Sequence, residues 1–209
     1  MPDRPFQPCI PSRATKVPTG PDWLHEIKHD GYRMLIQREG DRVRLFTRNG
    51  HDWSDRYPLI VAAARKLRTA SYVIDGEAVI LDDDGLADFD ALHTRKRDGE
   101  ARLIAFDLLT VDGTDIRAEP LRVRKAMLKM LLARSAGIST GAKSPGIQLN
   151  PFMRGEIGAA MFEHACKLGL EGIVSKRRDG SYHAGRSTNW IKVKNPASPA
   201  MLRAKEGSW

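Results

Sequence analysis

One short segment of the chain combines an amine, two carboxylates and a glycine in a spacing that suits nucleophilic chemistry. The segment is Glu26-Ile27-Lys28-His29-Asp30-Gly31-Tyr32-Arg33. If it is extended, Lys28 alternates with Glu26 and Asp30 on one face, and Gly31 permits a turn directly afterwards. A lysine amine held among polar groups at a turn is a candidate nucleophile. Taken alone, the segment is also compatible with the charged edge of a hairpin.

Five more short motifs follow in chain order. They are Thr47-Arg48-Asn49-Gly50, Asp75-Gly76-Glu77 at the end of an apolar strand, Phe106-Asp107-Leu108-Leu109, the EGIVSK run 171–176, and the WIKVK run 190–194. Together these motifs resemble those of the covalent nucleotidyltransferases, which are ATP-dependent DNA ligases, RNA ligases and mRNA capping enzymes. The segment from Tyr182 through Gly185-Arg186-Ser187 is similar to bacterial ATP-dependent ligases, in particular the ligase domain of end-joining enzymes. The resemblance covers about residues 18–194.

The resemblance implies that Lys28 attacks the α-phosphate of ATP, so that AMP becomes covalently bound to it and pyrophosphate leaves. An amine must be neutral to attack, whereas an ordinary lysine with a pKa of ~10.4 is only ~0.04% neutral at pH 7. Nearby cations favour the neutral form, and Arg33, Lys192, Lys194 and a bound divalent metal can supply them. Lys192 and Lys194 are two residues apart on one strand, so both can reach the same phosphate and act in catalysis with Lys28.

The resemblance also assigns the remaining nucleotide-binding residues. Glu26 and the backbone at Ile27 would read the adenine edge, and Phe106 would stack on the ring. Glu77 and Glu171 would hold the ribose and a Mg²⁺ or Mn²⁺ ion, because Mg²⁺ typically uses one or two carboxylates together with phosphate oxygens. Arg48 would bind the ribose or the acceptor 5′-phosphate. Considered singly, such residues are more often surface ion pairs or, for Phe106, a core aromatic.

The charge of the chain favours a polyanionic partner. The chain has 34 Lys and Arg against 26 Asp and Glu, a formal net charge of +8 at pH 7. A basic balance of this size suits nucleic acid, although plain solubility is the simpler explanation. We expect nicked or broken duplex DNA to bind at a basic surface beside the active site, made of Arg48, Lys176, Arg177, Arg178 and Arg186. The motifs leave RNA open as the acceptor.

Other features of the chain favour no different chemistry. The run 137–144 nearly matches a Walker phosphate loop, but it lacks the second glycine and Pro145 interrupts the helix that should follow. The Asp82-Asp83-Asp84 run lacks the alternating ligands of an EF-hand and predicts a hairpin turn. The six histidines and two cysteines lack metal-ligand spacing, and the cysteine usage suits a reducing cytosol.

The hydropathy pattern predicts no membrane association. No stretch approaches ~18 consecutive apolar residues, and the Met-Pro-Asp-Arg-Pro start has no apolar signal core. We therefore expect a cytoplasmic, nucleoid-associated bacterial protein that is monomeric.

The elements that must position these residues mix strands and helices. Predicted strands cover residues 26–37, 42–47, 72–81, 103–111, 172–176 and 190–194, and the first two form a hairpin. Predicted helices cover residues 54–67, 121–134 and 156–168. The first is capped by Asp52 or Ser54, and the third ends before Gly169. The second is apolar at Val123, Met127, Met130 and Leu131. Hairpin-linked strands without regular βαβ alternation predict an α+β fold. The resemblance implies two antiparallel sheets flanked by helices, with ATP between them.

The chain divides into three expected parts. Residues 1–22 are Pro-rich and are predicted to form an extended N-terminal arm. Residues 23–195 are expected to form the nucleotidyltransferase (adenylation) domain, and residues 196–209 a short C-terminal tail. Complete DNA ligases continue into an OB-fold domain, and this tail is too short for one. We therefore expect an ATP-dependent DNA ligase adenylation domain, weak in nick sealing, that serves DNA repair or end joining. The alternatives are RNA end repair, or a non-catalytic module that binds DNA ends or an OB-fold or end-joining partner in trans.

Overall fold

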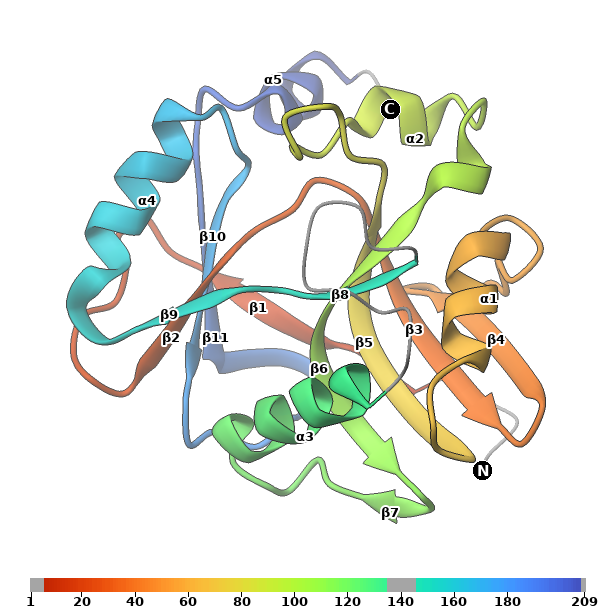
Figure 1. Ribbon diagram of the computed structural model, residues 1–209. Coiled ribbons are helices and arrows are strands. Elements are labelled where there is room, and N and C mark those ends of the chain that lie inside the picture. The colour runs from red at the N-terminus through yellow and green to blue at the C-terminus, as the bar shows by residue number, and fades with distance from the viewer. Residues whose placement is uncertain (1–5, 135–145, 208–209) are drawn as a thin grey trace.

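The computed structural model describes residues 6–134 and 146–207. Its strands form two sheets at the centre of the molecule, and helices lie around them (Figure 1). The first sheet has the order β1 (Cys9–Arg13), β11 (Gly185–Lys194), β10 (Gly172–Arg177), β2 (Trp23–Ile27) and β9 (Phe152–Arg154). Its neighbouring strands are antiparallel, except that β1 runs parallel to β11.

The second sheet has the order β4 (Arg42–Thr47), β3 (Tyr32–Glu39), β5 (Ser71–Val79), β6 (Arg102–Val111) and β7 (Thr114–Asp115), and β8 (Ile147–Leu149) pairs with β6. Its strands are antiparallel apart from the β6–β8 pair, which is parallel. The predicted α+β class is confirmed. The two parallel pairs were not predicted, because each joins strands that lie far apart in the sequence.

The helices are α1 (Pro58–Arg65), α2 (Phe89–His93), α3 (Leu121–Ala133), α4 (Gly158–Lys167) and α5 (Pro199–Glu206), with short 3-10 turns η1 (Asp98–Glu100) and η2 (Gly155–Ile157). α1 and α3 pack against the second sheet and α4 against the first. Gly169, at φ +71°, follows the end of α4 as predicted. Among the described residues, no helix has the length and apolar character that crossing a membrane requires.

The core is divided by the second sheet, and β3 shows how. Met34 and Ile36 face the larger cluster beneath α1 and α3, whereas Leu35 faces a smaller cluster between the two sheets. Successive side chains of a strand point to opposite faces, so a strand that is buried on both sides reads as a continuous apolar run. The smaller cluster includes Phe106 and Trp190, and this places it directly beside the residues predicted to bind nucleotide.

The strand predicted over residues 26–37 is in fact two strands in different sheets. β2 ends at Ile27 in the first sheet, and β3 begins at Tyr32 in the second. Lys28 therefore lies in the connection between the sheets rather than on a strand. Gly31 is required there because a Cβ would lie 2.2 Å from the carbonyl oxygen of Ala78.

Helix α3 is placed almost as predicted, but a different face of it is buried. Met130 is 52% exposed, whereas Arg124 and Lys125 are 0% and 2% exposed. Arg124 is buried because its guanidinium forms two hydrogen bonds to Asp107, at 2.8 and 2.9 Å. A buried cation that is paired and hydrogen-bonded avoids most of the cost of desolvation, so the helical pattern of apolar residues alone does not identify this face.

Other expected boundaries shift. α1 begins at Pro58 rather than at residue 54, because Ser54 instead accepts a hydrogen bond from the Leu45 backbone N–H. α4 begins at Gly158, after η2. The Asp82 carboxylate accepts the backbone N–H groups of Asp84 and Leu86, which confirms a turn. The run 137–144 lies outside the described residues.

The two terminal segments join the domain. Residues 9–13 are extended, as the prolines predict, but they form edge strand β1 with Cys9 buried rather than a separate arm. In the C-terminal segment, Ser198 caps helix α5 by accepting the Met201 N–H. Arg203 of α5 forms an ion pair with Asp30, two residues after Lys28.

Candidate functional site

A cleft between the two sheets brings together most of the residues predicted to bind nucleotide. The predicted residues that line it are Glu26, Ile27, Lys28, Arg33, Arg48, Glu77, Phe106 and Lys192. They come from both sheets and from the connections between strands. Glu171 and Lys194 are not part of the lining but lie next to it, because Glu171 contacts Lys28 and Lys194 contacts Glu171. Residues that were not predicted to bind nucleotide complete the walls, among them Pro8, Ile10, Asn150 and Val174.

Lys28 is held at the cleft by the start of β10. Its backbone N–H donates to the Gly172 carbonyl at 2.9 Å, and its Nζ lies 2.5 Å from Glu171 Oε2. The other Glu171 oxygen is 2.8 Å from Lys194 Nζ. Burial alone would raise the pKa of Glu171, but the ammonium groups of Lys28 and Lys194 outweigh this effect and lower it. Glu171 is therefore an ionised carboxylate shared by two lysines.

Lys192 and Lys194 lie on the same face of β11, as their spacing predicts. In the register between β10 and β11, Lys192 pairs with Val174 and Lys194 with Gly172, so the two amines follow one another along the strand. The pKa of Lys192 is lowered by burial and by the charges of Lys28, Lys194 and Arg48. Positive charge is therefore concentrated at this end of the cleft, which suits the binding of phosphate groups.

Glu77 lies in the wall across from these lysines. Burial raises its pKa to about 7, and the charges of Glu171 and Asp75 add to the rise while Lys28 and Arg33 oppose it. A carboxylate in this environment gains from a bound cation. Glu77 and Glu171 therefore fit a Mg²⁺ ion, which typically completes its coordination with phosphate oxygens and water. In the described part of the chain, no cluster of three or more His, Cys, Asp or Glu side chains forms a metal cage.

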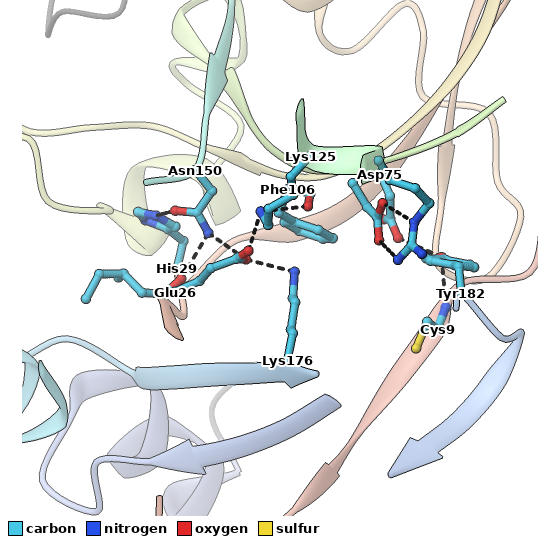
Figure 2. A network of polar contacts seen from close by, with 12 residues as sticks. Cys9, Glu26, His29, Asp75, Phe106, Lys125, Asn150, Lys176 and Tyr182 are labelled. Carbon is cyan, nitrogen blue, oxygen red and sulfur yellow. Dashed lines mark hydrogen bonds and ion pairs between the residues drawn. The ribbon is translucent and has the colours of Figure 1, made fainter. Parts of the chain in front are cut away.

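Arg33 belongs to a network that ties the two sheets together. Its guanidinium donates to both Asp75 oxygens, at 2.6 Å each, and to the Cys9 carbonyl. Tyr182 donates its hydroxyl to Asp75 at 2.7 Å and accepts the Cys9 N–H at 2.9 Å (Figure 2). The paired Asp75 raises the pKa of Arg33 in spite of burial. Nothing local in the sequence indicates this network, since Tyr182 and Asp75 are 107 residues apart.

Glu26 is buried and surrounded by donors. Its carboxylate lies 2.8 Å from Lys176 Nζ, contacts Lys125 Nζ, and accepts a hydrogen bond from Asn150 Nδ2 at 3.3 Å (Figure 2). Asn150 also donates to the Ile27 carbonyl at 3.3 Å. Burial would raise the pKa of Glu26, but the two lysines lower it. Both residues predicted to read the adenine edge are therefore held by the same amide.

Lys176 is not part of a DNA-binding surface, and that prediction was wrong. It is 2% exposed and lines the cleft, with its Nζ 4.2 Å from the centre of the Phe106 ring and 3.9 Å from that of Trp190. Burial lowers its pKa to about 8. The reason for the error is strand geometry: Lys176 alternates with Arg177 on β10, so one points inward and the other outward.

The other predicted DNA-binding residues lie at the surface. Arg48 and Arg186 are exposed, and Arg48 also lines the cleft. The side chains of Arg177 and Arg178 are 49% and 46% exposed. Asp179 lies 3.0 Å from Arg178 and neutralises part of this charge.

Lys125, Asn150 and Tyr182 are among the residues of the site that were not predicted from the sequence. For Lys125 a signal was present. It lies four residues after Leu121 and three before Leu128, so it falls within the buried stripe of α3. A lysine inside an apolar stripe indicates a buried partner of opposite charge. Asn150 lies in a connection between short strands, where no periodicity exists to mark it.

Comparisons with known proteins agree with this geometry. The family model described as "ATP dependent DNA ligase domain" matches residues 10–194. The multifunctional non-homologous end joining protein LigD of Pseudomonas aeruginosa is 36% identical over 190 residues, which is 90% of this chain and 22% of that protein. The crystal structure of the ligase domain of LigD from M. tuberculosis has a TM-score of 0.76 at 32% identity, covering 90% of this chain and 60% of that one.

A second similar structure is a mycobacterial DNA ligase D complexed with ATP and MES. It has a TM-score of 0.75 at 33% identity, and the match covers 90% of this chain and 60% of that one. The chain thus spans about a fifth of the length of the LigD proteins that it matches. The family model, in contrast, matches nearly the whole chain. The chain belongs to the ATP-dependent DNA ligase domain family.

Proposed function

We propose that this domain transfers AMP from ATP first to Lys28 and then to the 5′-phosphate of a DNA end. The observation that carries the proposal is the cleft in which Lys28 meets Glu171 beside two further lysines. Two comparisons support it: a similar ligase D structure was solved with ATP, and the relatives are end-joining proteins.

In the first step, the lone pair of Lys28 Nζ forms a bond to the α-phosphorus of ATP. The bond from that phosphorus to the bridging oxygen breaks, and pyrophosphate leaves with the electron pair. Nζ must be neutral for this attack, so it first gives up a proton to solvent and its 2.5 Å contact with Glu171 Oε2 opens. A second proton leaves Nζ for solvent once the bond to phosphorus has formed. Lys192 and Lys194 bind the phosphate oxygens and stabilise their negative charge.

A divalent metal ion accompanies ATP in this proposal. Glu77 and Glu171 would hold it, because Mg²⁺ and Mn²⁺ both prefer carboxylate oxygens. When bound, the ion would neutralise charge on the α-phosphate and the leaving pyrophosphate.

In the second step, an oxygen of the DNA 5′-phosphate attacks the phosphorus of lysyl–AMP, and the bond to Nζ breaks. The product is an adenylated DNA end, and the amine of Lys28 is restored. Arg48, Arg177, Arg178 and Arg186 would bind the phosphates of nicked or broken duplex DNA, with an OB-fold or end-joining protein as a further partner.

Labelling with α-³²P-ATP and Mg²⁺ tests the first step. The wild-type protein should take up label in an acid-labile, base-stable bond, as a phosphoramidate requires, and excess EDTA should abolish uptake. Lys28→Ala should take up no label because it lacks the amine. Lys28→Arg should take up none either, because a guanidinium stays protonated and cannot attack. Lys66→Ala, an exposed lysine after α1, is the matched control. Full labelling of Lys28→Ala would exclude Lys28 as the nucleophile.

A further inference from the structure

Lys125 is a buried lysine in the wall behind the cleft, outside all the motifs. Its side chain is 1% exposed. Its Nζ contacts Glu26 Oε1 and donates a hydrogen bond to the Phe106 carbonyl at 3.0 Å (Figure 2). The ammonium group therefore links two residues that come from different sheets.

The two lysines around Glu26 differ in what they can reach. Lys176 lines the cleft and lies against the Phe106 and Trp190 rings. Lys125 is not among the described residues that line the cleft, so it acts on a ligand only through Glu26 and Phe106. Both of these residues line the cleft, and the family resemblance implies that they contact the base.

Lys125 and Lys176 together compensate the buried charge of Glu26, and Lys125 is the one of the two that does not line the cleft. An ionised carboxylate can only accept hydrogen bonds, whereas a protonated one also donates, and an ionised buried carboxylate needs a compensating cation. The amino group at position 6 of adenine is a donor, which suits such an acceptor. Bases with a carbonyl at position 6 present an acceptor there, and a fixed carboxylate repels it.

We propose that Lys125 is a positioning residue for base selection: it keeps the Glu26 carboxylate ionised and oriented, and anchors the backbone of Phe106, so that the cleft prefers a 6-amino purine. This inference rests on the proposed function, since it takes the cleft to be the ATP site. Lys125 touches neither the base nor the reacting phosphate and so is not catalytic.

The test compares ATP with inosine triphosphate (ITP), which has a carbonyl at position 6. Lys125→Met should raise the KM for ATP in lysyl–AMP formation about tenfold, the size expected when a charge-assisted hydrogen bond is lost. The maximal rate should change less than the KM does, and the preference for ATP over ITP should fall about tenfold. Lys125→Arg keeps the charge and should restore part of the preference.

Lys129→Met, an exposed lysine of the same helix, is the matched control and should leave both parameters unchanged. Circular dichroism establishes whether Lys125→Met folds, and if it does not, Lys125→Gln serves for the same comparison. An ATP-to-ITP preference equal to that of the wild-type protein overturns the inference. An equal loss with both nucleotides also overturns it, because that indicates a structural role alone.

Failure of the proposed function gives a different result. A wild-type protein that forms no lysyl–AMP with any nucleotide contradicts the proposed function itself. The inference is then decided by calorimetric Kd values for ATP and ITP. A preference for ATP that Lys125→Gln removes supports it, and no such preference overturns it.

Discussion

Lys28 and Glu171 form an ion pair in which the amine nitrogen lies 2.5 Å from the carboxylate oxygen. The proposed nucleophile and a proposed metal-binding carboxylate are thus bound to each other. Lys194 occupies the other oxygen of Glu171 at 2.8 Å. The carboxylate separates two like charges that would otherwise repel across the cleft, and its contact with Lys28 must change when the amine attacks phosphorus.

Glu171→Gln should slow lysyl–AMP formation by about 10- to 100-fold, the range expected from loss of a hydrogen bond between charged groups. The amide keeps the shape of the side chain but leaves Lys28 and Lys194 without a counter-charge. Single-turnover labelling with α-³²P-ATP measures the rate. Glu163→Gln, which removes an exposed ion pair with Lys167 on α4, is the control and should react at the wild-type rate. A wild-type rate in Glu171→Gln would show that the pair has no part in the reaction.

Glu77 should make the protein less stable as the pH rises through 7. Its pKa is raised to about 7 in the folded protein, above the ordinary value of 4.5, so the folded state binds more protons than the unfolded state between these values. Stability is therefore lost as Glu77 ionises, by about 1 kcal/mol between pH 6 and pH 8. Urea denaturation at both pH values, with EDTA present, measures this loss.

The matched variant for this experiment is Glu77→Gln, which does not titrate. Its free energy of unfolding should fall by about 1 kcal/mol less than that of the wild-type protein over the same interval. Identical pH dependence in the two proteins would mean that Glu77 titrates well below pH 6.

Tyr182→Phe should destabilise the fold by about 1–2 kcal/mol, because it leaves the buried Cys9 N–H without its acceptor and removes one of the hydrogen bonds to Asp75 Oδ2, which keeps that from Arg33. The free energy of unfolding in urea measures the loss. Tyr32→Phe removes an exposed hydroxyl that contacts His93, and it should cost less than about 0.5 kcal/mol. Equal stability of Tyr182→Phe and the wild-type protein would mean that this network does not hold β1 to the second sheet.

Arg177→Glu with Arg178→Glu should weaken DNA binding but leave lysyl–AMP formation unchanged, since both side chains are about half exposed on the surface. We expect a Kd on the order of 10⁻⁴–10⁻⁶ M for the wild-type protein at physiological salt, with each lost phosphate contact reducing the log–log salt slope by about 0.9. Fluorescence anisotropy at several salt concentrations measures both quantities.

The control for DNA binding is Lys167→Glu, a charge reversal on α4. It reverses one charge where the arginine variant reverses two, so it should have less than half the effect of that variant if the surface near β10 is the one that meets DNA. An effect half as large as that of the arginine variant would indicate that net charge alone governs binding.

The amino-acid sequence alone was sufficient to predict the α+β class, the family and half of the described residues that line the cleft. The reason is that each motif is a short contiguous run of residues. The spacing of Lys28 and Gly31, or of Lys192 and Lys194, can therefore be recognised in the sequence itself. Apolar patterning also predicted α3, β4, β5 and β6 to within a few residues, because a helix buried on one face repeats at helical spacing and a strand buried on both faces is a continuous apolar run.

Only the tertiary structure decided where the charges lie. Glu26 meets Lys176 across 150 residues of sequence, and Lys125 reaches the same carboxylate from α3. Burial of each cation depends on a partner that a window of neighbouring residues does not contain, so Lys176 was predicted to lie on a DNA-binding surface and Lys125 was not predicted as part of the site. For the same reason the break between β2 and β3 was not predicted, because the segment has the pattern of a single strand. β2 pairs with β10 in the first sheet and β3 with β5 in the second, and Lys28 lies in the connection between β2 and β3.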